Sequence, residues 1–273
     1  MKKNDSISSN MLIIRDDNFQ RQNIPSAHGN ILLGNMSATL KVDLSKSDLV
    51  EALSVNTTLT ELDLSYNWTG DDDSPGFVRE LAIGLHNNER LMKLNMSNNE
   101  LGSAAEAGKV LGNMLKQNSV LTVLDVSNNK YHDRINGWQT NTPLVRGLAD
   151  GIQNNKTVLS LNMRKNGLCT LVSGRAIRDM LKQNSVLTHL DVSNNYTGAK
   201  ERAAGAIGLA TGIAEGLSAN TALTDLNISG NYIGQLTSVE GWTMDGAGDY
   251  ISPGGVDYGK EKPSDMEFRP YGV

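Results

Sequence analysis

Side chains that could support catalysis or bind a metal are few in this sequence and lie far apart. The histidines share no regular spacing, and no His-Glu-x-x-His pair of zinc ligands occurs. Neither a phosphate-binding P-loop nor a Gly-x-Ser-x-Gly nucleophile turn is found. We therefore predict no catalytic residue, no metal site, no cofactor and no enzymatic activity. The four histidines are expected to be ordinary surface or loop residues: His28, His86, His132 and His189.

Two further features could carry chemistry, and each has a simpler explanation. The three aspartates at 71–73 could begin a calcium loop, which needs Gly at its sixth position and Glu at its twelfth. Gly76 fits, but Ala82 occupies the twelfth position, so a solvated acidic loop is favoured. Cys169 has no histidine nearby in the sequence, which favours a half-buried structural thiol over a nucleophile.

The charge balance and the single cysteine restrict the partners and the compartment. The formal net charge is −5, which disfavours a duplex nucleic-acid binder because such a protein needs a basic stripe. No segment reaches the roughly 18 apolar residues of a membrane span, and the apolar run at 11–14 is too short for a signal peptide. One cysteine excludes an internal disulfide, and four Asn-x-Ser/Thr sites fall in a repeat framework where a glycan would clash. We therefore expect a cytoplasmic protein with no membrane span.

These scattered residues are positioned by an internal repeat. The segments at 114–129 and 180–195 differ only where Val123 is replaced by His189, and they lie 66 residues apart. Both contain Leu-x-x-Leu-x-Leu-x-x-Asn, which occurs six times with successive starts 32, 30, 37, 29 and 36 residues apart. The six occurrences begin at Leu59, Leu91, Leu121, Val158, Leu187 and Leu223.

Each position of this motif has a structural role. In the first repeat, Leu62 and Leu64 alternate with polar residues, which predicts a short strand with one buried face. The closing Asn67 lies where the backbone bends, and its amide can both donate to and accept from the backbone there. Stacked repeats are then expected to form a structural ladder of Asn67, Asn99, Asn129, Asn166, Asn195 and Asn231.

Helical patterns separate the predicted strands. Residues 103–115 show them best, because Ser103 and Glu106 form a capping box ahead of an apolar stripe that includes Leu111. We predict helices near 77–87, 104–117, 144–154, 174–183 and 206–218, with strands near 61–65, 93–97, 123–127, 160–164, 189–193 and 225–229. The fold class is therefore α/β, a solenoid with a curved parallel sheet on its concave side and helices on its convex side.

At these residues the chain resembles the leucine-rich-repeat family, and within it the ribonuclease-inhibitor-like class. That class pairs the strand motif with a full helix in repeats of about this length. The wording N-S-V-L-T-x-L-D-V-S-N-N is similar to the repeats of cytosolic regulators and of NOD-like immune receptors. The resemblance covers residues 38–234. It implies the solenoid fold but indicates little about function, since the family serves many partners.

The chain divides into three predicted parts. A polar segment at 1–37 precedes the repeat domain at 38–234, and a partial cap with an extended tail rich in Gly and Pro occupies 235–273. Residues 1–30 are expected to be loose, a short capping strand is expected at 39–44, and a helix at 48–54. Leu236, Val239 and Trp242 are expected to form a last partial turn.

A second pattern groups the six repeats into three doublets. Odd repeats carry Asp at the second outward strand position, and even repeats carry Asn. The aspartates are Asp63, Asp125 and Asp191, and the asparagines are Asn95, Asn162 and Asn227. Duplication of a doublet explains the origin of this alternation, and whether it has a use stays open at this point.

Outward-facing strand residues are the candidates for binding a partner. This face is mostly acidic, with Arg164-Lys165 as its one basic spot, so a partner with a basic surface would fit. The alternative is that the polar columns only hydrogen-bond along the sheet and keep it soluble. The candidates are Glu61, Asp63, Lys93, Asn95, Asp125, Asn162, Arg164, His189, Asp191 and Asp225.

Three classes of function are consistent with these features. The first is a protein–protein interaction scaffold, which we favour because no catalytic set is present. The second is a regulator of a partner enzyme, of the GTPase-activating type that uses the same repeat class. The third is a structural subunit that its tail anchors within a larger assembly. An immune-receptor role is less favoured, because the nucleotide-binding domain that usually accompanies such repeats is absent from this chain.

Connections after the odd repeats carry aromatic residues that could form a row along one rim of the sheet: Trp68, Tyr131, Trp138 and Tyr196. Because Trp and Tyr are over-represented at binding hot spots, we predict that these rings contact the partner. Replacing Trp68 and Trp138 together by Ala should then weaken partner binding by at least about tenfold while the melting temperature barely moves. A lower melting temperature with unchanged binding by the folded fraction would show instead that each ring covers its own insertion.

Overall fold

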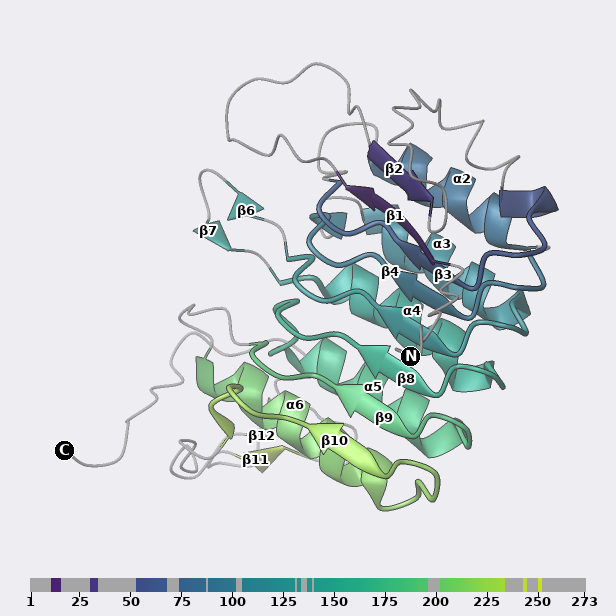
Figure 1. Cartoon of the computed structure of the whole chain (residues 1–273). Coiled ribbons are helices and arrows are strands. Elements are labelled where there is room, and N and C mark those ends of the chain that lie inside the picture. The colour runs from purple at the N-terminus through teal and green to yellow at the C-terminus, as the bar shows by residue number, and fades with distance from the viewer. Residues whose placement is uncertain are drawn as a thin grey trace, which may run out of the picture.

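Six parallel strands, one from each repeat, form the continuous layer of the computed structural model (Figure 1). The structure describes residues 11–15, 30–33, 53–67, 74–86, 88–101, 105–130, 132–133, 137–138, 140–195, 202–233, 243–244 and 250–251. Neighbouring strands pair in the order β10-β9-β8-β5-β4-β3. The strands are β3 (Glu61–Asp63), β4 (Lys93–Asn95), β5 (Val123–Asp125), β8 (Ser160–Asn162), β9 (His189–Asp191) and β10 (Asp225–Asn227). The predicted parallel solenoid is thus confirmed.

Each strand is two residues shorter than predicted, and a local hydrogen bond explains the difference. In β3 the Oδ1 of Asp63 accepts from the backbone N–H of Ser65 at 2.9 Å, which begins the bend directly after the strand. The following residue, Tyr66, then has a φ of 62° in the left-handed region. Regular pairing therefore ends before the ladder asparagine is reached.

Five helices connect the strands and form the second layer (Figure 1). They are α2 (Ser74–His86), α3 (Ala105–Gln117), α4 (Thr142–Asn154), α5 (Leu171–Gln183) and α6 (Arg202–Leu217). Helix α5 starts three residues before its predicted position because Thr170 caps it, with its hydroxyl accepting from the Ser173 N–H at 3.0 Å. The predicted capping box at Ser103 lies outside the described residues.

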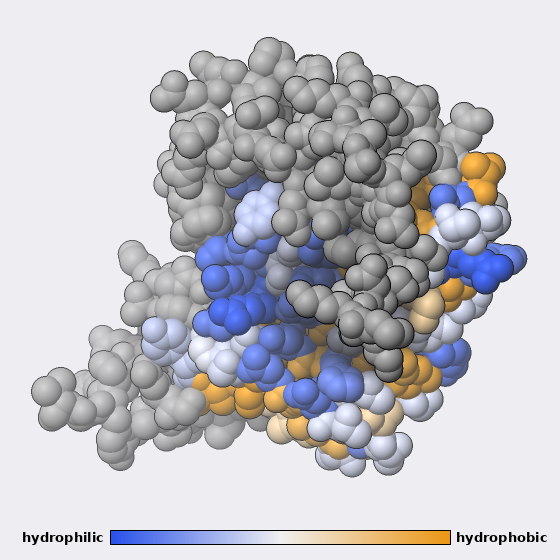
Figure 2. All heavy atoms as spheres, viewed as in Figure 1, coloured by the Kyte–Doolittle hydropathy of each residue, from blue (hydrophilic) through white to orange (hydrophobic). Residues whose placement is uncertain are grey.

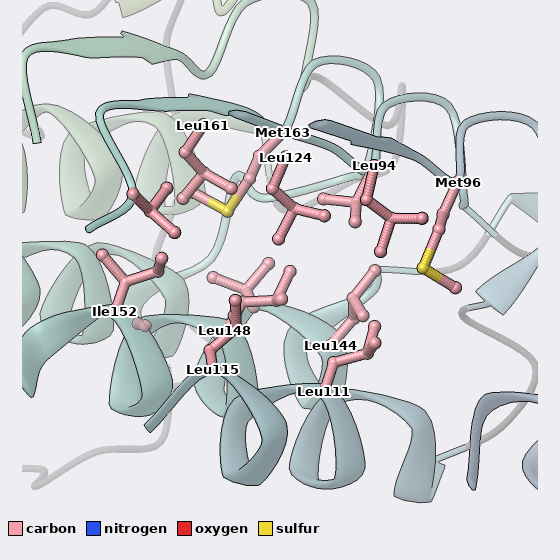
Figure 3. Close-up of a cluster of buried hydrophobic side chains, with 14 of the residues drawn as sticks. Leu94, Met96, Leu111, Leu115, Leu124, Leu144, Leu148, Ile152, Leu161 and Met163 are labelled. Atoms are coloured by element: carbon pink, nitrogen blue, oxygen red, sulfur yellow. The ribbon is translucent and has the colours of Figure 1, made fainter. Parts of the chain in front are cut away.

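The core lies between the two layers and consists almost entirely of aliphatic side chains. One strand leucine per repeat stands in register with the next, as Leu94, Leu124 and Leu161 do. Figure 3 shows these leucines pointing toward Leu111, Leu115, Leu144, Leu148 and Ile152 on α3 and α4. The eight side chains are at most 1% exposed, so the period-two and helical patterns of the sequence face each other.

Two strands near the N-terminus extend the sheet beyond the predicted repeats. Strand β1 (Met11–Arg15) pairs in parallel with β3, and β2 (Asn30–Leu33) pairs antiparallel with β1. The expectation that residues 1–30 are loose is therefore wrong for these strands, because the unpaired edge of β3 offers the apolar run at 11–14 a place in the sheet. The predicted capping strand at 39–44 lies outside the described residues. Of the helix predicted at 48–54, the structure describes only the end, where residues 53–55 are helical.

Short antiparallel pairs occur in the insertion of the third repeat and in the C-terminal segment. The first joins β6 (His132–Asp133) to β7 (Gly137–Trp138), and the second joins β11 (Thr243–Met244) to β12 (Tyr250–Ile251). An extended tail was expected from residue 246 onward, but Tyr250–Ile251 form strand β12, which pairs with β11. The expected partial turn at Leu236, Val239 and Trp242 lies outside the described residues, and the domain boundaries at 37 and 234 stay predictions.

Glycines bring two pairs of helices into backbone contact. A Cβ added to Gly112 of α3 would lie 2.0 Å from the carbonyl oxygen of Gly147 on α4. The second pair packs in the same way, because a Cβ on Gly212 of α6 would lie 2.0 Å from the oxygen of Gly174 on α5. Side chains at these positions would force the helices apart, so the sequence uses glycine there despite its low helix propensity.

We predict that Gly112→Ala destabilises the protein by about 1–3 kcal/mol or more, since the new methyl group meets rigid backbone. The neighbouring substitution Asn113→Ala, at an exposed position of the same helix, serves as the control and should change stability by less than about 0.5 kcal/mol. Urea denaturation of both variants measures the difference. Equal stabilities of the two variants would contradict the close helix contact.

Candidate functional site

The exposed face of the sheet carries three columns of side chains, which we name by their place along the strands. Figure 2, in the same view as Figure 1, shows hydrophilic side chains gathered over this face. Because the registers are identical from β3 to β10, equivalent residues stand side by side. The first column contains Glu61, Lys93, Val123, Ser160, His189 and Asp225; the second contains Asp63, Asn95, Asp125, Asn162, Asp191 and Asn227; the third contains Ser65, Ser97, Ser127, Arg164, Ser193 and Ser229.

The first column is chemically mixed and accessible. The Lys93 ammonium lies 2.6 Å from the Glu61 carboxylate, and this ion pair is open to solvent. At the other end of the column, His189 and Asp225 stand in register and both are exposed. The Nδ1 of His189 lies 2.8 Å from the hydroxyl of Thr188. The column therefore offers a different charged or polar group in almost every repeat.

The second column is a framework rather than a set of free groups. In every repeat its Oδ1 accepts from the backbone N–H two residues later, at 2.7–3.1 Å. Asp63 is only 4% exposed. These residues fix the turn after each strand, which is the bond pattern of an Asx-turn.

The Asp/Asn alternation of this column has a physical use. The Asn162 amide donates to Oδ2 of Asp125 at 2.9 Å, and the Asn227 amide donates to Oδ2 of Asp191 at 3.1 Å. Aspartates in all six repeats would place like charges directly opposite each other on adjacent strands, which is destabilising. In these two doublets the Asn replaces this repulsion with a hydrogen bond.

The third column and the position after it carry a basic cluster in the fourth repeat. Arg164 and Lys165 are both exposed, at a point where the other repeats have Ser followed by Asn, Tyr or Gly. Lys165 has a φ of 56°, a left-handed conformation that a residue other than Gly, Asn or Asp adopts at a cost of roughly 1–2 kcal/mol. Burial, and then the charge of Lys165, lower the pKa of Lys130 from the third repeat, so these two side chains lie near each other.

The asparagines that close the motif form a ladder along the whole sheet. In the first five repeats, the backbone N–H of the ladder asparagine donates to Oδ1 of the ladder asparagine in the next repeat, at 2.5–2.8 Å. Through Nδ2, Asn129 also donates to the carbonyls of Met96 at 2.9 Å and Val126 at 2.8 Å. Five of the six are at most 1% exposed, and Asn67 at the N-terminal end is half-buried.

A second asparagine ladder runs along the opposite edge, and the sequence analysis missed it. Asn155 accepts from the N–H groups of Thr157 and Val158, and its amide donates to the carbonyls of Leu115 at 2.7 Å and Asn118 at 3.1 Å. Its equivalents lie three residues before the first residue of every motif, which is Leu in five repeats and Val158 in the fourth, and this constant spacing could have revealed them. The six residues are Asn56, Asn88, Asn118, Asn155, Asn184 and Asn220.

Side chains of the predicted aromatic row, Trp68, Tyr131, Trp138 and Tyr196, lie outside the described part of the structure. Two other aromatic residues are exposed, Tyr66 in the first repeat at 51% and Tyr232 in the sixth at 49%. Sequence analysis did not single them out. Tyr66 directly precedes a ladder asparagine and Tyr232 directly follows one, and both have a left-handed backbone, so their rings project from the turns after the strands.

Reactive and metal-binding groups contribute no second site within the described ranges. Cys169 is buried, and burial raises the pKa of its thiol to about 12, so the nucleophilic thiolate is scarce at neutral pH. No cluster of His, Cys, Asp and Glu suited to a metal ion occurs among the residues that the structure describes. None of the helices in those ranges is both long and apolar enough to cross a bilayer.

Comparison with known proteins agrees with the repeat architecture. The family described as Leucine Rich repeat matches residues 55–73, which contain the first strand motif. Six such motifs on parallel strands, each followed by its ladder asparagine, give this chain the leucine-rich-repeat solenoid fold. The repeat lengths and full helices are compatible with the ribonuclease-inhibitor-like class.

Among solved structures, the chain is similar to the leucine-rich repeat-containing protein LegL7 from Legionella pneumophila. The identity is 20% and the TM-score is 0.35, with 70% of this chain and 63% of that chain covered. This chain thus spans less than two thirds of the length of that solved chain. No curated protein matches the sequence.

The ladder geometry gives a direct test of the framework. Asn129→Ala should cost about 1–3 kcal/mol, because the substitution leaves buried backbone groups of the second and third repeats without their partner. Asn154→Ala, at an exposed position at the end of α4, is the matched control and should change stability by less than about 0.5 kcal/mol. Chemical denaturation monitored by circular dichroism compares the two. A loss below about 0.5 kcal/mol for Asn129→Ala would show that the ladder is dispensable.

Proposed function

We propose that this protein is an interaction scaffold that binds another protein through the concave face of its sheet and the adjoining loops. The observation that supports this is the contrast between columns. The second column repeats the same turn-forming group in all six repeats, whereas the first column changes its exposed chemistry from repeat to repeat. The residues of the first column do not form the turns after the strands, so their side chains can vary to suit a partner. Exposed polar groups on a rigid sheet are well placed to bind one.

The charges of this face favour a partner with a largely basic surface. Asp63, Asp125 and Asp191 form a line of carboxylates along the second column, and Asp225 and the paired Glu61 add to the first. Complementary potentials speed association and set orientation more than they set affinity. We further propose that binding takes place in the cytoplasm, since Asn195, which lies in a glycosylation sequence, is fully buried in the ladder.

A bulky substitution in the middle of the face tests this proposal. Ser160 is half-buried in the first column, between Val123 and His189, so Ser160→Trp should block docking without disturbing the core. Affinity capture from native extract with the wild-type chain identifies the partner, and titration with the variant should show at least about tenfold weaker binding. Lys109→Trp places the same ring at an exposed position of helix α3 and should bind like wild type.

Other outcomes would assign the protein differently. Loss of binding in Lys109→Trp but not in Ser160→Trp would move the interface to the helices and contradict the proposal. A stoichiometric partner that is lost on deleting 246–273, with Ser160→Trp neutral, would indicate a structural subunit. Faster GTP turnover by the captured partner in the presence of this chain would indicate a regulator that works through the same face.

A further inference from the structure

The fourth repeat departs from the other five at two adjacent positions, and both departures add a positive charge. The third column has Ser in every repeat except the fourth, where Arg164 replaces it. The next position has Tyr66, Asn98, Asn128, Lys165, Asn194 and Gly230, all in the left-handed conformation. Lysine is poorly suited to that conformation, whereas Asn tolerates it. The sequence thus accepts backbone strain to keep Lys165 beside Arg164.

This basic cluster is held rigidly at the centre of the solenoid. The carbonyl of Arg164 accepts from the Asn128 N–H at 2.8 Å, and the Lys165 N–H donates to the Ser193 carbonyl at 3.1 Å. Both side chains are exposed, and neither takes part in an ion pair among the described residues. Lys130 directly follows Asn129, whose N–H donates to Oδ1 of Asn166 at 2.8 Å, so it lies beside the fourth repeat. Its side chain is half-exposed, and burial and then the charge of Lys165 lower its pKa.

We propose that Arg164 and Lys165, with Lys130 beside them, form a binding site for an acidic side chain of a protein partner. This inference rests on the proposed scaffold function and makes it more specific. The planar guanidinium of Arg164 matches a carboxylate in a bidentate pair, and the Lys165 ammonium contributes a second positive charge. An Asp or Glu of the partner would then seat at the end of β8, between the serines of the neighbouring repeats.

The surroundings of the cluster favour a peptide over a polyanion. Asp125 and Asp191 flank Asn162 on the adjacent strands, so two carboxylates lie close to the cluster along the second column. Nucleic acid or an anionic membrane presents a continuous array of negative charge and would be repelled by them. A partner segment with one acidic residue among basic ones satisfies both sets of groups. The site therefore specifies a charge pattern rather than a net charge.

Selection of short peptides from a random display library on the full chain tests this site. The wild-type chain should enrich peptides that have a central Asp or Glu flanked by Lys or Arg. The variant Arg164→Ser/Lys165→Asn carries the residues of the second, third and fifth repeats and should fold at least as stably. It should bind the enriched peptides at least about tenfold more weakly and lose the acidic preference. Lys109→Ser/Lys156→Asn removes two exposed charges elsewhere and should behave as wild type.

Each other result overturns a distinct claim. Enrichment of peptides without acidic residues, or equal binding by the Arg164→Ser/Lys165→Asn variant, rejects this site but leaves the scaffold function standing. Failure of the wild-type chain to enrich any peptide contradicts the scaffold function and this site together. Binding of a heparin oligosaccharide or of phosphatidylcholine–phosphatidylserine vesicles through Arg164 and Lys165, without acidic peptides, would replace the protein partner with a polyanion.

Discussion

Burying a bent backbone without leaving its polar groups unpaired is the constraint on which this structure depends. Every repeat turns the chain twice, once after the strand and once after the helix, and each turn interrupts regular hydrogen bonding. An Asn side chain resolves both interruptions, because one amide supplies an acceptor and two donors. Asn129 does so after a strand and Asn155 after a helix, each joining its own repeat to the preceding one. The two ladders therefore hold the stack at both edges, with the leucine core between them.

The doublets seen in the sequence are not separate structural modules. Asp–Asn hydrogen bonds join the two strands inside a doublet, as between β5 and β8. Glycine contacts join helices across the doublet boundaries, since α3 belongs to the second repeat and α4 to the third. The Asp–Asn hydrogen bonds on the sheet thus lie within doublets, whereas the glycine contacts between helices lie across the boundaries of the doublets. Exposed ion pairs such as Lys116–Asp150 also bridge neighbouring helices, but at the surface each contributes little. Because each boundary between repeats is held on either the sheet side or the helix side, we expect several repeats to unfold together rather than the stack to open at one boundary.

Periodicity made much of this fold predictable, whereas features without periodicity were missed. The strand leucines and the first ladder recur in all six repeats, so their places could be inferred. The second ladder recurs just as strictly, but it was missed because its asparagines lie before the strand motif and were not included in the pattern. Strand β1 has no repeated counterpart, and its pairing with β3 depends on a contact between segments distant in sequence. The use of Asn162 could not be inferred either, because it required knowing that Asp125 stands directly beside it.

The same comparison of repeats separates the candidate binding residues by what they are free to do. Sequence analysis treated the aspartates of the exposed face as equivalent, but the structure distinguishes them. Asp63 is buried, Asp125 and Asp191 accept from both a backbone N–H and a neighbouring amide, and Asp225 is exposed. A carboxylate with its lone pairs already engaged still contributes charge at a distance, yet it has less capacity for a new short bond. Long-range attraction of a basic partner can therefore come from the framework, while contact specificity rests with groups outside it, namely the first column and the Arg164–Lys165 pair.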